Sequence, residues 1–140
     1  MNASPPTKSQ YETLAEFRYA LRLFLGFSER AAKGAGITPR AYQVMLAIQG
    51  YPGRDSVTLG ELAEKLQIRP HSAVGLVDRM EAQKWVVRRV SQEDRRKVHV
   101  ALTARGCALL EKLAAVHRDE LRRVSPHLRA LLAQVQGDLP

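Results

Sequence analysis

The stretch that decides the fold is residues 58–102, TLGELAEKLQIRPHSAVGLVDRMEAQKWVVRRVSQEDRRKVHVAL. In its first half, apolar residues recur every three or four positions in two runs, 59–66 and 70–83. This spacing is typical of amphipathic helices. Only the short turn 67–69 separates the two runs. Two short helices joined by such a turn predict a helix-turn-helix.

The hydrophobic pattern then changes from a helical to an alternating one. Residues 85–90 and 97–102 are both strand-like, with clean alternation at Val98, Val100 and Leu102, and the polar loop 91–96 separates them. A β-hairpin that directly follows a helix-turn-helix is called a wing. We therefore predict a winged helix-turn-helix module over about residues 38–103.

Long helices are expected on both sides of this module, over about residues 9–36 and 104–140, because apolar residues there form stripes at helical spacing. Ser125-Pro126 is expected to break the last helix. One module cannot cover so much apolar surface. We therefore expect a single domain, residues 1–140, that is mainly α with a small β-hairpin wing and has terminal helices that dimerise. Residue types that favour helix ends also occur at the expected boundaries. The first helix is expected to end at Gly34 or Gly36. Helix starts are expected at Ser9 with Glu12, Thr38 with Pro39, Thr58 with Glu61, Pro70, and Thr103.

Positive charge is concentrated on the second helix of the pair and the wing. The 140 residues include 22 Lys and Arg against 14 Asp and Glu, a net charge of +8. Residues 69–105 hold nine of the bases and four of the acids, so this segment carries five of the eight net charges. This clustering of positive charge indicates that the basic surface binds a polyanion such as duplex DNA, rather than only keeping the protein soluble. A membrane-surface protein would instead carry its bases along one long amphipathic helix.

Several other classes are not expected. The longest run without a charged residue, 41–53, is shorter than the roughly 20 apolar residues of a membrane span. No secretory signal pattern opens the chain, and a single cysteine, Cys107, fits a reducing compartment, so we expect a cytoplasmic protein. The isolated histidines are expected at the surface and Cys107 as a packed thiol. No nucleophile–base or metal-ligand spacing is present, so we expect no enzyme, no metal and no cofactor.

The chain resembles the MarR family of transcriptional regulators (multiple antibiotic resistance regulators) over about residues 10–135. The most specific part is Asp94-Arg95-Arg96 followed by Leu102-Thr103, which keeps the family's wing signature D-x-R-x5-L-T. The segments 61–63 (ELA), 76–81 (LVDRME) and 103–106 (TARG) also match the family. The ordered set is more specific than any single motif in it.

The resemblance implies a homodimer whose terminal helices interlock. The second helix of each module would occupy a major groove of a pseudo-palindromic DNA site, and each wing would reach the flanking minor groove. It also implies a sequence-specific regulator, most often a repressor of its own or neighbouring genes, relieved by a small phenolic or anionic ligand. The suggested cations for that ligand are Arg18, Arg22 and Arg40.

Candidate DNA contacts follow from the chemistry of the side chains. The residues at the start of the second helix are expected to contact base edges, and Val74 is expected to contact a thymine methyl group. Arg96 is narrow and always charged, which suits a minor groove, and Asp94 is expected to orient the wing arginines or cap the turn. Phosphate contacts are expected from Arg79 and Arg88. The full set is Arg69, His71, Ser72, Val74, Arg79, Arg88, Asp94, Arg95, Arg96 and Lys97.

Two residues depart from the family pattern. Gly75 stands where relatives often carry an exposed polar or basic residue, which weakens direct contact with the bases. Lys84 replaces the usual glycine before the first wing strand, so it must adopt a left-handed conformation or end the helix differently. The alternative hypothesis is therefore a winged-helix protein-interaction module without sequence-specific DNA binding.

Overall fold

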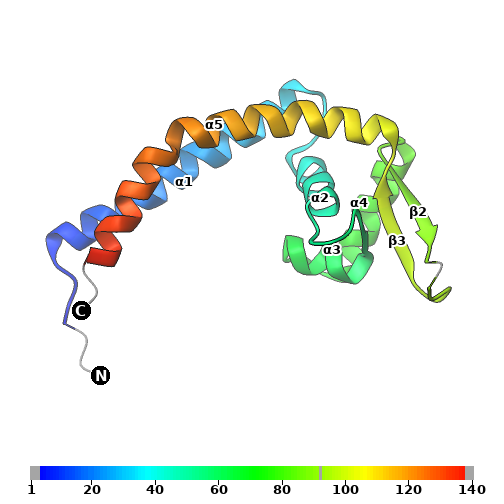
Figure 1. Cartoon of the computed structure of the whole chain (residues 1–140), viewed down its shortest axis with the longest axis horizontal. Helices are drawn as coiled ribbons and strands as arrows, with labels where there is room; N and C mark the ends of the chain where they lie inside the picture. The colour runs from blue at the N-terminus through cyan, green and yellow to red at the C-terminus, as the bar shows by residue number, and fades with distance from the viewer. Residues whose placement is uncertain (1–3, 92, 138–140) are drawn as a thin grey trace.

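The computed structural model describes residues 4–91 and 93–137, and these residues form a mainly helical chain with a three-stranded sheet (Figure 1). This confirms the predicted fold class. Gln92 in the wing loop and residues 138–140 of the last expected helix lie outside the described residues. In chain order the elements are α1 (Lys8–Gly34), α2 (Pro39–Gln49), β1 (Ser56–Thr58), α3 (Leu59–Leu66), α4 (Pro70–Ala82), β2 (Val86–Val90), β3 (Val98–Leu102) and α5 (Ala104–Gly137).

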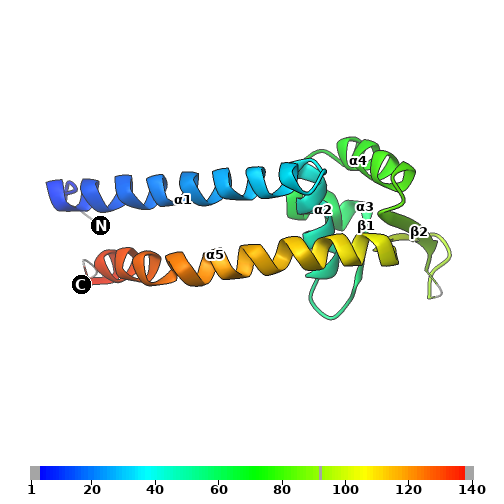
Figure 2. The same cartoon turned by 90° about the horizontal axis from the view of Figure 1, so that it is seen from above.

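The two long helices form an arm that projects from the rest of the structure. Figures 1 and 2 show α1 and α5 running side by side and antiparallel, with both chain ends at the far end of the arm. Near that end the hydroxyl of Thr13 donates to Gln134 Oε1 at 3.0 Å. The remaining elements, α2 to β3, gather at the other end, which places the helix-turn-helix and the wing away from the arm (Figure 2).

His117 of α5 joins the arm to the rest of the chain. Its ring stacks on Tyr42 of α2, with centroids 4.3 Å apart and planes at 16°, and it is only 6% exposed. Nδ1 donates to the carbonyl of Leu113 at 2.7 Å, and Nε2 lies 2.8 Å from the Ser28 hydroxyl of α1, within hydrogen-bond distance. The expectation of a surface histidine is therefore wrong at this position, because the ring's apolar faces and both nitrogens are satisfied inside the protein.

The sheet contains one strand more than the predicted hairpin. Its order is β1-β3-β2, all antiparallel, with Val57 opposite Val100 and Arg88 opposite the same residue on the other side. Val57 and Val100 are fully buried and pack with Leu62, Val77 and other apolar residues of the core. A strand as short as β1 leaves no readable alternation, so the sequence pattern did not predict it.

Several expected helix starts are confirmed, and the expected start of the first helix is wrong. The confirmed N-caps are Thr38, Thr58 with Glu61, and Thr103, whose hydroxyl accepts from the Gly106 amide at 3.0 Å. The first helix starts instead with Thr7 and Gln10 as its capping box, not with Ser9 and Glu12.

The helix α5 continues through Pro126 where a break was expected. Pro126 is exposed, while Val124 and Leu128 on either side line a cavity against α1. Packing along the arm therefore outweighs the loss of one helical hydrogen bond. Figure 1 shows that α5 is bent along its length rather than interrupted.

The end of α4, the start of β2 and the start of α5 meet at one joint. Lys84 has φ of 64°, the left-handed one of the two outcomes expected for it, and its carbonyl accepts from the Thr103 hydroxyl at 2.7 Å. The Trp85 carbonyl accepts from the Thr103 amide at 3.0 Å. A Cβ on Gly106 would lie 2.1 Å from this Trp85 oxygen. Any side chain at Gly106 would therefore push α5 away from the first wing strand.

We expect Gly106→Ala to destabilise the protein by about 1–3 kcal/mol or more, because the backbone at Trp85 must move. Urea unfolding followed by circular dichroism measures this change. Gly34→Ala is the matched control, since nothing lies within 4 Å of an added Cβ there, and it should stay within about 0.5 kcal/mol of the parent. Equal stability of the two variants would contradict the close approach at the joint.

Candidate DNA-binding interface

The start of α4 presents an exposed polar surface. Ala73, Val77 and Met80 anchor the helix in the core, so the opposite side of the helix faces outward. The residues expected to contact bases, Arg69, His71, Ser72 and Val74, are all exposed at this end. Arg69 provides no side-chain cap, Pro70 has no amide hydrogen, and the Ser72 amide donates to the Arg69 carbonyl at 3.0 Å. The His71 amide is therefore left for a phosphate oxygen.

The turn before α4 fixes the angle between the two short helices. Gln67 ends α3 in the left-handed conformation, with φ of 53°. Its side-chain amide donates to the Glu64 carbonyl at 2.8 Å, and the Ile68 amide donates to the Ala63 carbonyl at 3.0 Å. These bonds satisfy carbonyls that the helix end would otherwise leave open.

A cluster at the start of α3 holds the preceding loop. Glu61 accepts from the Arg54 guanidinium and, at 2.8 Å, from the Tyr51 hydroxyl. The hydrogen bond from Arg54 is the main reason that the pKa of Glu61 falls to about 2, from 4.5, against the opposing effect of partial burial. Glu61 is therefore ionised at any physiological pH, and the loop stays tied to the helix-turn-helix.

The wing loop is organised around Asp94. Its Oδ1 accepts from the Arg96 backbone amide at 3.0 Å and from Arg96 Nε at 3.2 Å, and its carbonyl accepts from the Lys97 amide at 2.9 Å. The bond from the Arg96 amide, with that from its side chain, holds the pKa of Asp94 below its usual value. Asp94 thus both caps the turn and orients Arg96, the two roles that the sequence analysis gave as alternatives.

The wing arginine itself extends into solvent. The Arg96 side chain is 91% exposed even though Asp94 holds its Nε, and Arg95 and Lys97 beside it are exposed as well. An arginine that is fixed at one end and free at the other loses little conformational entropy when it meets an anion. The geometry is that of a preorganised cation at the tip of a narrow hairpin.

Arg88 has other partners than the phosphate that was expected for it. Nη1 donates to Glu81 and Nη2 to Asp78, each at 2.7 Å, and the side chain is only 26% exposed. The guanidinium is therefore bound within the protein through both terminal nitrogens, which argues against the expected phosphate contact. Arg79 is exposed on α4, where its Nη1 lies over the space left open at Gly75.

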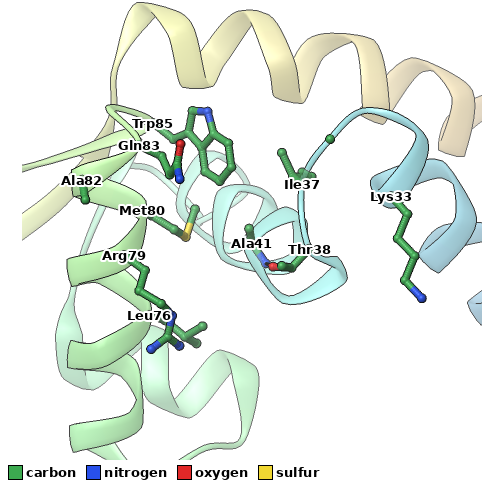
Figure 3. Close-up of a pocket in the computed structure, with 11 residues that line it drawn as sticks. Lys33, Ile37, Thr38, Ala41, Leu76, Arg79, Met80, Ala82, Gln83 and Trp85 are labelled. Carbon is green, nitrogen blue, oxygen red and sulfur yellow. Dashed lines mark hydrogen bonds between the residues drawn. The ribbon is translucent and has the colours of Figure 1, made fainter.

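The expected effector cations do not line the cavity that the structure shows beside α4. This cavity, of about 600 Å³, lies between the turn that joins α1 to α2 and the C-terminal half of α4. Its cations are Lys33 and Arg79, which come from opposite sides in Figure 3, whereas Arg18, Arg22 and Arg40 are exposed and do not line it. The sequence pattern could not separate these arginines from Lys33, because all of them lie on solvated helix faces. The full lining is Lys33, Gly36, Ile37, Thr38, Ala41, Leu76, Arg79, Met80, Ala82, Gln83 and Trp85.

Other chemistry has little support among the described residues. Residues 4–91 and 93–137 contain no group of three His, Cys, Asp or Glu side chains placed to hold a metal ion. None of the helices in these ranges is long and apolar enough to cross a membrane. Cys107 is exposed, so its assignment as a packed thiol is wrong; one turn into α5 its side chain points away from the core.

Comparison with known proteins agrees with this geometry. The model of the MarR family matches residues 35–97, from the turn after α1 through the wing loop. The HTH-type transcriptional regulator PecS of Dickeya dadantii is 26% identical over 111 residues, 74% of this chain and 67% of that protein. The transcriptional repressor MprA of Escherichia coli K12 is 24% identical over 121 residues, 76% of this chain and 68% of that protein. The chain is similar to the MarR family of transcriptional regulators over residues 35–97. It is a DNA-binding transcriptional regulator and not an enzyme.

Solved structures of other proteins share the whole fold. A MepR variant from S. aureus, bound to an oligodeoxyribonucleotide, superposes with a TM-score of 0.67 at 19% identity and covers 93% of this chain and 98% of its own. CouR from Rhodococcus jostii RHA1, bound to p-coumaroyl-CoA, superposes with a TM-score of 0.67 at 24% identity and covers 88% and 90% of the two chains. At these identities the likeness establishes the fold and leaves the individual contacts to be tested.

We expect Arg96→Ala to weaken binding to the preferred DNA site about tenfold or more, because a preorganised cation is lost from the wing. The melting temperature should not change, since the side chain supports no core. Fluorescence anisotropy with a labelled duplex measures the affinity. Arg118→Ala on α5 removes the same charge from an exposed position on the arm and is the matched control.

Asp94→Ala separates orientation from charge. This variant removes a negative charge from the wing, which by general electrostatics would strengthen binding. We expect weaker binding to the preferred site instead, because Arg96 loses the oxygen that accepts from both its backbone amide and its Nε. Tighter binding by Asp94→Ala, or unchanged binding by Arg96→Ala, would contradict the role given to the wing.

Proposed function

We propose that the protein is a cytoplasmic, homodimeric, sequence-specific repressor that binds a pseudo-palindromic operator near its own or neighbouring genes. The observation that carries the proposal is the pairing of two surfaces on one module: the exposed start of α4 and the preorganised cation of the wing. We call α4 the recognition helix of this proposal. A recognition helix and a wing on the same module suit adjacent major and minor grooves of DNA. The similar protein MprA is named a transcriptional repressor, which supports repression rather than activation in this proposal.

The arm supports the dimer. Large apolar side chains remain exposed along α1 and α5, and in a lone protomer they would face water over the length of the arm. A second copy of the chain would cover them, with residues 9–36 and 104–140 as the dimerisation part and 38–103 as the DNA-binding part. The exposed residues include Tyr11, Leu14, Tyr19, Leu21, Leu23, Leu25, Val116, Leu121, Leu132 and Val135.

In this proposal the contacts divide by chemistry. His71, Ser72 and Val74, with Arg69, meet base edges in the major groove, and Arg96 enters the minor groove beside Arg95 and Lys97. Arg79 meets a phosphate. Asp94 acts on DNA only through Arg96.

Selection from a pool of random-sequence duplexes tests the proposal without an assumed operator. We expect a two-fold-related motif with half-sites about one helical turn apart, bound by one dimer and preferred about a thousandfold over a scrambled duplex at physiological salt. Light scattering gives the stoichiometry. Equal affinity for selected and scrambled duplexes would favour the protein-interaction alternative, and a monomer on a single half-site would exclude the dimer.

The cavity between α1, α2 and α4 is the proposed effector site. Its walls are mostly apolar and its two cations, Lys33 and Arg79, suit a small aromatic anion. CouR, with the same fold, is bound to p-coumaroyl-CoA, a larger molecule that also combines an aromatic ring with negative charge, which supports an aromatic anion as the ligand. A ligand wedged between the α1–α2 turn and α4 would favour a different placement of α4 and so weaken operator binding.

Trp85 reports on this site directly, because it is the only tryptophan of the chain and lines the cavity. Titration with p-coumarate and with p-coumaroyl-CoA is expected to change its fluorescence saturably and to release the operator over the same concentration range. Lys33→Met should weaken ligand binding about tenfold and leave operator affinity without ligand unchanged. Arg22→Met is the matched control on the same helix. A fluorescence change without operator release would exclude an effector role.

A further inference from the structure

Arg88 bridges two elements that contact different parts of a DNA site. It lies in the middle of β2, and its guanidinium binds two carboxylates that lie three residues apart on α4, Asp78 and Glu81. Its backbone amide also donates to Glu81 Oε2, at 3.2 Å. A planar guanidinium held by two separate carboxylates has its orientation fixed, in a way that a single flexible ion pair does not.

The bridge lies where the sheet leaves the core. Arg88 pairs across the strands with Val100, which is fully buried. The next pair on the same face toward the wing tip, Val90 with Val98, is 60% and 38% exposed. Beyond Arg88 the hairpin projects into solvent, so this contact adds a second attachment of the wing to α4, on the tip side of the joint at Trp85.

The local charge argues against a direct DNA contact. Asp78, Glu81 and Arg88 together carry one net negative charge, and a phosphate would have to displace carboxylates that already sit at 2.7 Å. This arrangement also accounts for the presence of two acidic residues on a helix proposed to approach DNA, because Arg88 neutralises part of their charge. The trio holds the wing in place and does not attract the polyanion.

We propose that Arg88 is a positioning residue for DNA recognition, which clamps the wing to the recognition helix at the spacing of adjacent grooves. The proposal rests on the operator binding proposed above. Sequence-specific binding needs α4 and the wing tip to meet their grooves at the same time, so it depends on the clamp. Non-specific binding depends on charge along the continuous phosphate backbone and tolerates a loose wing.

Arg88→Lys is the decisive variant because it keeps the charge and removes the planar fork. We expect affinity for the selected operator to fall about tenfold, with affinity for a scrambled duplex and the slope of log affinity against log salt both unchanged. A phosphate contact would behave in the opposite way, since lysine serves as a point charge for phosphate. Unchanged operator affinity in Arg88→Lys would therefore overturn the proposal.

Arg89→Lys is the matched control. Arg89 is the next residue on the same strand, is exposed, and pairs with His99 on the other face of the sheet. It should behave like the parent in every measurement. An equal loss in both variants would reflect a general arginine-to-lysine effect on the wing and would overturn the assignment to Arg88.

Hydrogen exchange of the free protein tests the clamp without DNA. We expect the amides of residues 86–102 to exchange faster in Arg88→Lys than in the parent or in Arg89→Lys, with α1 and α5 unchanged. Unaltered exchange in the wing would overturn the clamp. If the parent shows no sequence preference while the wing of Arg88→Lys exchanges faster, the clamp stands and the proposed operator binding fails.

Discussion

The placement of the wing depends on the joint at Trp85, where the recognition helix, the first wing strand and α5 come together. The Trp85 carbonyl accepts from the Thr103 amide, the Lys84 carbonyl accepts from the Thr103 hydroxyl, and Gly106 allows α5 to approach that backbone. The left-handed conformation of Lys84 turns the chain into β2 without a longer loop. One threonine thus caps α5 and ties it to the end of α4, so the arm, the helix and the wing form one connected unit.

Carboxylates on the proposed DNA-binding surface hold two arginines in place. Asp94 holds Arg96 at the wing tip, and Asp78 with Glu81 holds Arg88 at the wing base. An exposed ion pair contributes little to stability, so the value of these pairs is in geometry. The two arginines differ in what remains free: Arg96 is 91% exposed and Arg88 is 26% exposed. Arg96 can therefore contact an anion, whereas the guanidinium of Arg88 is bound by two carboxylates of the protein itself.

The sequence predicted the elements well and the partners of long side chains poorly. Local signals were sufficient for the caps at Thr38, Thr58 and Thr103 and for the left-handed Lys84, because each depends on residues close by in the chain. The burial of His117 depends on Tyr42 and Ser28, far away in sequence, and no local pattern shows them. The same applies to Arg88, whose carboxylates come from another element. The candidate DNA contacts at the start of α4 were placed correctly on an exposed surface, since helical periodicity alone separates them from the buried Ala73 and Val77.

The proposed effector cavity and the proposed DNA-binding surface share one element, and this sharing supplies a physical route for regulation. Met80, Gln83 and Trp85 line the cavity at the end of α4, beside the joint that carries the wing, while Lys33 and Ile37 line it from the turn after α1. A ligand there has α4 on one side and the arm on the other. If it favours a wider separation of the two, it moves the recognition helix and, through Arg88, the wing with it. Because coupling between two binding events is reciprocal, the operator must weaken the ligand by the same factor by which the ligand weakens the operator.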